Sequence, residues 1–379
     1  MTESVFYPDR LLKSLRENAL NHDWAKEACD DIVARAEPWN RMTQEELWNA
    51  MFGSTLTRSW MVWSNGHCPA CKEDVTMYLW EIDPIARPWK VVCPHCKEFF
   101  PKNDFQAYYE SGLDKHGVFD ADLADRSLLV ERQGVGSGEW GVGSPERPEG
   151  FGIDDGNGYS DGEHRWMFIA TYLIYGQWKR HVYAGITHLA DAYTISGDVA
   201  YARKAGILID RLADLYPTFD FEQQGVLYEK KPDFGYITNW HDACKEVCLI
   251  ALAYDQIRPA LLEDREYVSF VQSQQKRYQL TFSKSTAAEI AAHIENRIFR
   301  DTQQNIPKIK SNFPGQEITL ITLEAVLSQT LDTEQIARMI DDMLEEATAV
   351  NGVTGEKGLA GYSAIVLHML AEFLATLDR

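Results

Sequence analysis

The chain has 379 residues, of which 45% are hydrophobic and 25% are charged. This length allows one large domain or two ordinary ones, and the composition is typical of a folded globular protein. The formal net charge of −20 disfavours nucleic acid and anionic membranes as partners, because the field of the whole chain repels them. An acidic polymer could bind only at a local basic patch.

The N-terminal residues MTESVFYPDR contain no apolar core of a signal peptide, and no later stretch has transmembrane length. We therefore expect a soluble, cytoplasmic protein, or a secreted or periplasmic one if a leader has been removed. In the cytoplasm the seven cysteines are expected to stay reduced. The sequence carries no signal for an oligomeric state.

The first part of the chain divides into three segments. Residues 1–59 predict an N-terminal helical segment, with apolar residues at helical spacing. Residues 60–109 are rich in Trp, Cys and Pro and predict a small β insert with short strands, for example at 76–80. Residues 110–162 are rich in Gly and Asp and predict a long irregular segment.

From about residue 163 the sequence predicts a succession of helices with few strand signals between them. The expected helices are 163–177, 179–196, 199–216, 239–257, 276–299, 315–330, 333–349 and 361–377. This order favours an antiparallel array of helix hairpins, such as an α/α toroid, over a βαβ fold. We therefore predict a mostly α protein with a catalytic-type α/α-toroid domain, or incomplete helix-hairpin barrel, over 110–379.

Two Cys-x-x-Cys pairs lie in the 60–109 insert. They are Cys68 with Cys71 and Cys93 with Cys96. Four thiolates at this spacing can close a tetrahedron around Zn²⁺. Two paired motifs argue against a lone redox dithiol, and the missing signal peptide argues against disulfides. Because four cysteine ligands leave no coordination position open, we predict a structural zinc site and not a catalytic one.

Three further stretches carry a resemblance to a known family. They are 154–172, which begins DDGNGY, 189–217, which begins LADAYTISGD, and 351–362, NGVTGEKGLAGY. Together with the cysteine pairs and the run FFPKNDF at 99–105, they resemble the heparinase II/III-like polysaccharide lyases over most of residues 20–379. Members of that family have an α/α toroid followed by a β-sandwich, and the β-sandwich is apparently absent from this chain.

The resemblance implies β-elimination at a uronic acid in an acidic polysaccharide or oligosaccharide. A donor neutralises the uronate carboxylate, a base removes the C5 proton, and an acid, often Tyr, protonates the leaving glycosidic oxygen. The C5 proton is a very weak acid without help. A donor that stabilises the enolate-like charge therefore contributes most in the transition state.

Site residues are carried over from the resemblance position by position. Tyr362 falls at the Gly-Tyr position of the family and is the expected acid. Asn312 falls where the family places an Asn that contacts the carboxylate, and Gln316 stands where many members have a His. Lys357 and Tyr159 are expected substrate contacts, Lys357 as part of a local basic patch and Tyr159 by stacking on a sugar.

The start of the predicted 239–257 helix supplies the remaining candidates. Asn239 either caps the helix or binds substrate. Trp240 can stack on a sugar, and His241 can act as the base.

Two alternatives remain open from the sequence. Gln316 in place of His, and the apparent lack of a β-sandwich, are compatible with a non-catalytic carbohydrate-binding or remnant toroid. An α/α-toroid glycoside hydrolase would instead use two carboxylates, for example Asp154 or Asp155 with Glu246. Inversion would require them to lie about 6.5–9.5 Å apart. Turn formation accounts equally well for the Asp-Asp-Gly run at 154–156.

Overall fold

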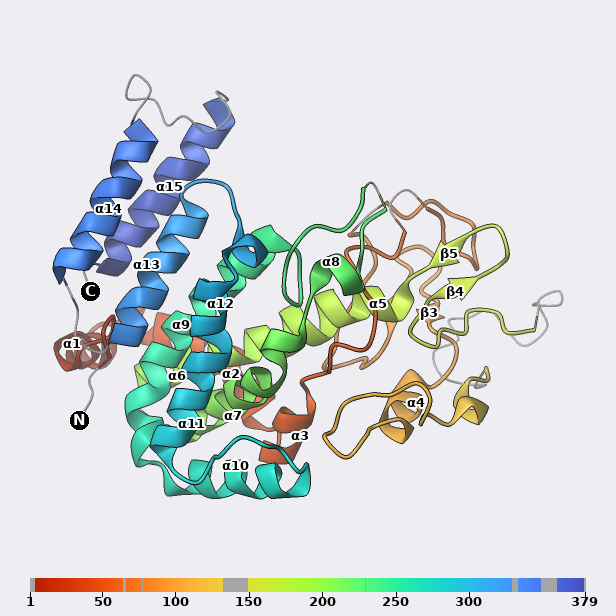
Figure 1. The fold of residues 1–379 in the computed structure, drawn as a ribbon, viewed down its shortest axis with the longest axis horizontal. Helices are drawn as coiled ribbons and strands as arrows, with labels where there is room; N and C mark the ends of the chain where they lie inside the picture. The colour runs from red at the N-terminus through yellow and green to blue at the C-terminus, as the bar shows by residue number, and fades with distance from the viewer. Residues whose placement is uncertain are drawn as a thin grey trace.

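The computed structural model of the chain describes residues 4–63, 66–76, 78–131, 149–228, 230–328, 333–348 and 360–377. Within these ranges the protein is mostly helical, with three short two-stranded sheets (Figure 1). The prediction of a mostly α protein is therefore confirmed. No helix in these ranges is long and apolar enough to cross a membrane.

The longer helices follow one another along the chain. They are α1 (Asp9–Asn21), α2 (Asp23–Asn40), α6 (Ala184–Ser196), α7 (Val199–Leu215), α9 (Trp240–Glu263), α10 (Arg265–Arg277), α11 (Ala287–Ile294), α13 (Gly315–Ser328), α14 (Thr333–Thr348) and α15 (Ala360–Leu377). Shorter ones are α3 (Gln44–Asn49), α4 (Phe105–Ser111), α5 (Phe168–Tyr172), α8 (Phe221–Gln224) and α12 (Asp301–Gln304). The π-helical segments are η2 (Leu173–Tyr183) and η4 (Glu295–Arg300), and the 3₁₀ segments are η1 (Arg126–Leu128), η3 (Tyr216–Thr218) and η5 (Ile306–Ile309).

The strands are two residues long and pair in three places. β1 (Arg58–Ser59) runs parallel to β6 (Gly225–Val226), with Arg58 opposite Gly225. β2 (Val91–Val92) pairs with β3 (Phe99–Phe100), and β4 (Tyr159–Ser160) pairs with β5 (Arg165–Trp166), both antiparallel. Such short ladders contribute little stability alone, so the region depends on packing against the helices.

Local capping signals place several helix ends. Thr43 and Glu46 form a capping box at the start of α3, and Thr286 and Glu289 form one at the start of α11. Helix α6 ends at Gly197, whose φ of 72° lies in the left-handed region that glycine adopts without strain. The predicted break between 196 and 199 therefore has a direct backbone cause.

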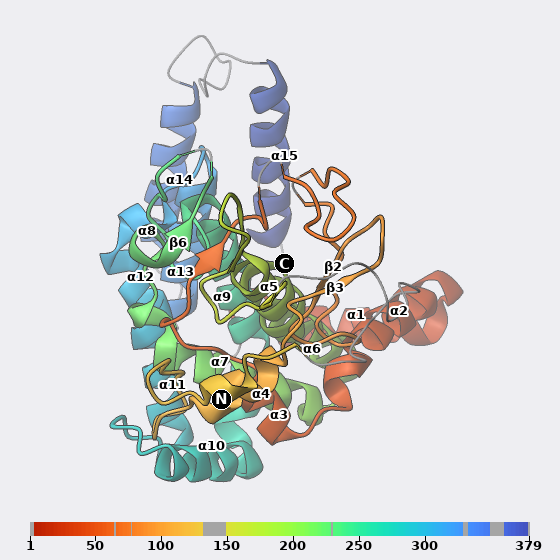
Figure 2. The ribbon, with the colours of Figure 1, turned by 90° about the vertical axis from the view of Figure 1, so that its right-hand side faces the viewer.

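Helix α9 lies at the centre of the packing. It packs against α6, α7, α11 and α13, while α6 also packs against α2 and α7. In both views α14 and α15 stand at one end of the molecule and α10 stands at the opposite end (Figure 1, Figure 2). Strands β3, β4 and β5 and helix α4 lie on the side of the molecule away from α13–α15 (Figure 1).

The structure corrects three sequence predictions of local elements. The expected break at 178 is absent, because α5, η2 and α6 run without interruption from 168 to 196. The expected helix 276–299 is divided between α10 and α11 by a loop. The described residues of the run 76–80 form no strand, and Trp80 packs its ring on the core instead.

The loop between α10 and α11 contains one partner of a buried ion pair. Lys284 is 0% exposed. Its ammonium lies 2.8 Å from Asp210 Oδ2 and 2.6 Å from Asp214 Oδ1, both on α7. A buried cation needs such partners, and the loop carries Lys284 to them. No signal for this contact exists in the local sequence.

A buried carboxylate on α9 holds the N-terminal segment of the chain. Asp255 is 0% exposed. It accepts hydrogen bonds from Val5 N at 3.0 Å, from Phe6 N at 2.9 Å and from Ser4 Oγ at 2.5 Å. Because a buried carboxylate is stable only when its oxygens are paired, Asp255 and this segment stabilise each other.

We predict that Asp255→Ala lowers the free energy of unfolding by about 2–4 kcal/mol, because it leaves two backbone donors without an acceptor. Urea denaturation at neutral pH measures the change. Glu263→Ala removes an exposed carboxylate from the same helix and should change the free energy by less than about 0.5 kcal/mol. Equal effects of the two variants would contradict the assigned role of Asp255.

Candidate functional site

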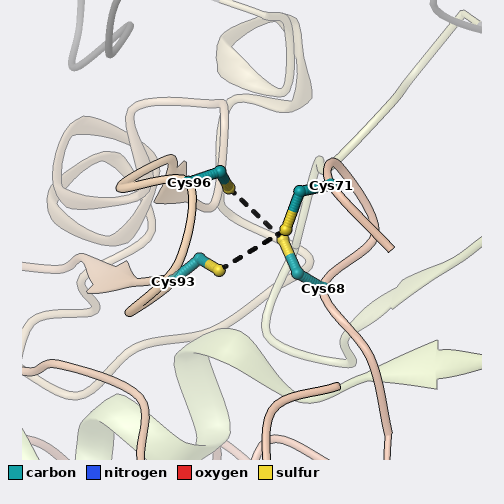
Figure 3. Close-up of side chains that lie close together, drawn as sticks. All are labelled: Cys68, Cys71, Cys93 and Cys96. Carbon is teal, nitrogen blue, oxygen red and sulfur yellow. Dashed lines mark hydrogen bonds between the residues drawn. The ribbon is translucent and has the colours of Figure 1, made fainter. Parts of the chain in front are cut away.

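The four cysteines of the insert come together as predicted. The sulfur atoms of Cys68, Cys71, Cys93 and Cys96 all lie within 4.8 Å of one another, and the two pairs face each other (Figure 3). The separations are 3.8 Å between Cys68 and Cys96 and 3.9 Å between Cys71 and Cys93. A tetrahedron with metal–sulfur bonds of about 2.3 Å has edges of about 3.8 Å. The cluster can therefore hold a metal ion.

Both cysteine pairs sit in turns of the same conformation. Lys72 N donates to Cys68 O at 2.9 Å, and Lys97 N donates to Cys93 O at 3.1 Å. Lys72 has φ 65° and Lys97 has φ 60°, in the left-handed region that lysine seldom adopts. Both turns have this uncommon backbone conformation. In each of them the two cysteine sulfur atoms point toward the centre of the cluster.

The cysteine insert is anchored to the helical core by aromatic side chains. The ring of Trp80 lies 6.1 Å from that of Phe100 and 5.7 Å from that of Phe168. Trp166 Nε1 donates to the carbonyl of His67 at 2.7 Å. A metal ion with four cysteine ligands has no open position for substrate, so the geometry fits a structural role.

A second cluster forms where α9 and α13 begin. The ring of His241, in the first turn of α9, lies with Nδ1 2.9 Å from Ser311 Oγ. Asn312 follows Ser311 in the segment that leads into α13. Cys244 Sγ donates to the carbonyl of Gly315 at 3.4 Å, one turn further along α9. Residues about 70 positions apart in the sequence are thus brought to one place.

The structure places most of the predicted α9 and α13 residues in this cluster. Asn239 caps α9, its side chain accepting from Asp242 N at 3.4 Å. Trp240 Nε1 donates to Asp233 Oδ2 at 3.1 Å, and the Trp240 ring lies 5.6 Å from the His241 ring. Gln316 is half-buried in the first turn of α13.

Other predicted substrate residues lie elsewhere. Tyr159 is 6% exposed. Its ring stacks on Trp166 at 5.5 Å and contacts Phe151 at 5.6 Å. A ring covered in this way packs the core under the cysteine insert, so we leave Tyr159 out of the site. Lys357 lies outside the described residues.

Tyr362 belongs to the first turn of α15, and its side chain lies outside the described part of the chain. The helix itself reaches the start of α13, since a Cβ on Gly315 would come within 3.2 Å of Met369 Cε. Seven residues of α-helix separate Tyr362 from Met369, which is roughly 10 Å along the axis.

The acidic run proposed for a hydrolase is a turn. Asp154 is 0% exposed, and its carboxylate accepts from the backbone N–H groups of Gly156, Gly158 and Ile169 at 2.7, 2.9 and 3.0 Å. Asp155 pairs with Arg126 at 3.6 Å. A carboxylate occupied by three backbone donors organises its loop, as the turn interpretation expects.

The contribution of η2 to the site was not predicted from the sequence. Lys179 of η2 forms an ion pair with Asp242 of α9. Its ammonium lies 4.7 Å from the centre of the Trp60 ring and 5.0 Å from that of Tyr175. The spacing of Tyr175, Lys179 and Tyr183 at intervals of four was a usable signal. The break expected at residue 178 placed Tyr175 in one predicted helix and Lys179 and Tyr183 in the next, so this spacing was not recognised.

Glu246 lies one turn beyond Asp242 and is 6% exposed. Thr238 Oγ1 donates to its Oε2 at 2.6 Å, and its Oε1 has no hydrogen-bond partner within the described residues. Burial raises the pKa of this carboxyl from 4.5 to about 7, and Asp242 raises it further while Lys179 lowers it. Glu246 is thus a buried acid that titrates near neutral pH.

Comparisons with known proteins leave the family of the chain open. No family model matches it, and no solved structure matches it significantly. A UPF0735 ACT domain-containing protein of Acetivibrio thermocellus is 29% identical over 126 residues, which is 33% of this chain and 78% of that protein. The resemblance to heparinase II/III-like lyases is therefore still a prediction.

We predict that Glu246 makes stability fall as the pH rises. The folded chain binds this proton more tightly than the unfolded chain, because the pKa is raised from 4.5 to about 7. The free energy of unfolding therefore decreases through that window, by up to about 3 kcal/mol. Glu246→Gln keeps an acceptor for Thr238 and removes the titration.

Urea denaturation at pH 5 and pH 8 measures the effect. The Gln variant should be more stable than the native chain at pH 8 by about 1–3 kcal/mol and nearly equal to it at pH 5. Glu263→Gln, an exposed change on the same helix, should show no such pH-dependent difference. A constant difference between the Glu246 variant and the native chain at both pH values would contradict the raised pKa.

Proposed function

We propose that this chain is a polysaccharide lyase that cleaves a uronic-acid-containing saccharide by β-elimination at the start of α9. The observation that carries the proposal is the contact of His241 Nδ1 with Ser311 Oγ at 2.9 Å, next to Asn312. It brings an imidazole at the start of α9 close to the segment in which the resemblance places the amide donor Asn312.

The hydrogen bond with Ser311 defines how His241 acts as a base. When Nδ1–H donates to Ser311 Oγ, the lone pair of the neutral imidazole is on Nε2. His241 is exposed, so Nε2 is accessible to a saccharide. In the reaction Nε2 takes the C5 proton, and the electron pair of that C–H bond forms the C4=C5 double bond.

The amide of Asn312 is the proposed donor to the uronate carboxylate. Helices α9 and α13 both begin at this cluster, and the N-terminal end of a helix carries partial positive charge. This arrangement favours an anion there in a chain whose net charge is −20. It also stabilises the negative charge that develops on the carboxylate as the C5 proton leaves.

Tyr362 is the proposed acid, by the resemblance. The C4–O bond breaks as the double bond forms, and the phenol O–H gives its proton to the leaving glycosidic oxygen. Trp240 and Asn239, together with Gln316, are the proposed substrate contacts around His241. We further propose that the helices form an α/α toroid, that the partner is an acidic polysaccharide, and that the protein acts in the cytoplasm.

One observation bears on each of the two alternative functions, the glycoside hydrolase and the non-catalytic carbohydrate-binding toroid. The backbone contacts of Asp154 disfavour a hydrolase that uses this residue with Glu246. Gln316 in place of His still favours the non-catalytic carbohydrate-binding toroid as the second candidate, because it removes one titratable group from the site. Product chemistry separates the three functions.

We propose that the four-cysteine cluster holds a structural Zn²⁺. The sulfur separations of 3.8 and 3.9 Å fit tetrahedral thiolate ligation, and Zn²⁺ is the metal that four thiolates in paired turns ordinarily select. The ion would close the insert and fasten it to the core. It supplies no step of the elimination.

For the lyase proposal we predict a rise in ultraviolet absorbance from the unsaturated uronate product on alginate, a glycosaminoglycan or ulvan. His241→Ala and Asn312→Ala should each lower kcat by about 10²–10⁴-fold. Tyr362→Phe should lower it similarly. His22→Ala, an exposed change between α1 and α2, should leave the rate unchanged.

The outcome that refutes elimination is a flat absorbance trace on every polymer from folded, metal-loaded protein. Retained polymer binding would then support the non-catalytic toroid. A saturated product with a new reducing end would support a hydrolase.

For the metal proposal we predict one zinc per chain by atomic emission spectroscopy. Cys71→Ser should lose the metal and lower the melting temperature, because metal binding contributes on the order of 10 kcal/mol to folding such a segment. Cys29→Ser changes a half-buried cysteine on α2 and should retain one zinc. Native protein that keeps its melting temperature after complete metal removal would overturn the structural role.

A further inference from the structure

Three aromatic rings from three separate segments meet beside the start of α9. Trp60 follows β1, Tyr78 lies in the cysteine insert, and Tyr175 lies in the π-helix η2. The ring centres are 5.8 Å apart for Trp60 and Tyr175, 6.0 Å for Tyr78 and Tyr175, and 6.4 Å for Trp60 and Tyr78. Trp60 Nε1 also donates to the hydroxyl of Tyr78. We call these three residues the aromatic triad.

The aromatic triad is partly open to solvent. Tyr78 is 52% exposed, and Trp60 and Tyr175 are half-buried. Neighbouring apolar rings that are partly open to solvent can form part of a ligand-binding surface. Ring faces and edges of this kind pack against the C–H faces of sugars.

A cation lies against the aromatic triad. The ammonium of Lys179 is 4.7 Å from the Trp60 ring centre and 5.0 Å from the Tyr175 ring centre, which places it by cation–π attraction. Its carboxylate partner is Asp242. The side chains of Lys179 and Asp242 are 26% and 24% exposed, so a dissolved anion can reach the pair.

The π-helix brings these groups into position. With a wider turn than an α-helix, η2 presents Tyr175 and Lys179 toward α9, where Asp242 and the buried Glu246 lie. Single-turn π-bulges are rare and occur often at functional sites. Here η2 covers 11 residues, and its Lys179 contacts the same turn of α9 that carries His241.

We propose that Lys179 is the residue that selects acidic saccharides: the aromatic triad packs against a uronate unit, and the carboxylate of that unit replaces Asp242 as the ion-pair partner of Lys179. This inference deepens the proposed function and rests on it for the substrate class. The two side chains are 26% and 24% exposed, and the incoming carboxylate carries the same charge as the one that it displaces, so the exchange leaves Lys179 paired. Lys179 then supplies the local basic group that the net charge of −20 demands.

The exchange makes Asp242 a competitor of the substrate. Removing the Lys179 charge must weaken binding of an acidic saccharide, whereas removing the Asp242 charge must strengthen it. If the ion pair had only a structural role, removing the Asp242 charge would not strengthen binding of the saccharide. The opposite signs of the two effects distinguish recognition from simple stabilisation.

The experiment is isothermal titration calorimetry of uronate trisaccharides from alginate and from a glycosaminoglycan, in a His241→Ala background that prevents turnover. Lys179→Ala should raise Kd about 10-fold, and Asp242→Asn should lower it about 3-fold. Lys179→Arg should keep Kd within about 3-fold, because the charge remains. Lys276→Ala, an exposed lysine at the end of α10, should leave Kd unchanged.

A second probe isolates the carboxylate. The same trisaccharides with their carboxylates reduced to alcohols should bind more weakly than the uronates. Lys179→Ala and Asp242→Asn should not alter the Kd of the reduced sugars. Uronate binding that is indifferent to Lys179, or weakened by Asp242→Asn in a folded variant, would overturn the inference. Failure of the chain to bind any uronate in the panel would do the same.

The two proposals fail in distinguishable ways. If the native chain performs elimination but Kd does not depend on Lys179, the role of Lys179 is refuted and the lyase proposal stands. If Kd changes as expected but the native chain performs no elimination, the lyase proposal is refuted and the recognition of acidic saccharides stands.

Discussion

Burial of helix α9 is the constraint on which the rest of the structure depends. Over 24 residues it packs against α6, α7, α11 and α13. A helix surrounded in this way cannot leave its charged side chains unpaired, because a buried charge without a partner is strongly destabilising. Each buried charge on α9 therefore determines where another segment of the chain must lie.

Two buried charges on α9 show this, and a third buried group differs from them. Asp255 holds the N-terminal segment through Val5 N and Phe6 N. Arg258 lies 3.7 Å from Glu295 of the π-helix η4 and donates to a carbonyl of α13 at 3.4 Å. Glu246 accepts from Thr238 at 2.6 Å. The first two charges fasten distant segments to the helix, while the third keeps one carboxylate oxygen unpartnered.

The surroundings of the polar residues of α9 differ between the two ends of the helix. Toward its C-terminal half α9 is enclosed, and Asp255 and Arg258 are buried there against other segments of the chain. At its first turn the burial ends, and His241 and Asp242 reach solvent between η2 and the segment that leads into α13. A rigid, buried helix that presents polar side chains at one exposed turn can hold those groups in place for binding or catalysis.

Local sequence patterns were sufficient to predict the mostly helical class, most helix ends from 199 onward and the cluster of four cysteines. They were sufficient because helical periodicity, Gly197 at a left-handed cap and paired Cys-x-x-Cys turns are local patterns with local causes. The start of α9 as a candidate site was also visible in Asn239, Trp240 and His241. Tyr159 was predicted to stack on a sugar, but Phe151 and Trp166 cover its ring in the fold, and these contacts could not be predicted from the local sequence.

Which charged side chains meet depends on the tertiary structure. The partners of Lys179 are Asp242 on α9 and the ring of Trp60, far away along the chain. Lys284, in the loop between α10 and α11, has its partners on α7. Electrostatic and cation–π contacts act through space and leave no periodic trace in the sequence. Their positions follow from how the helices pack.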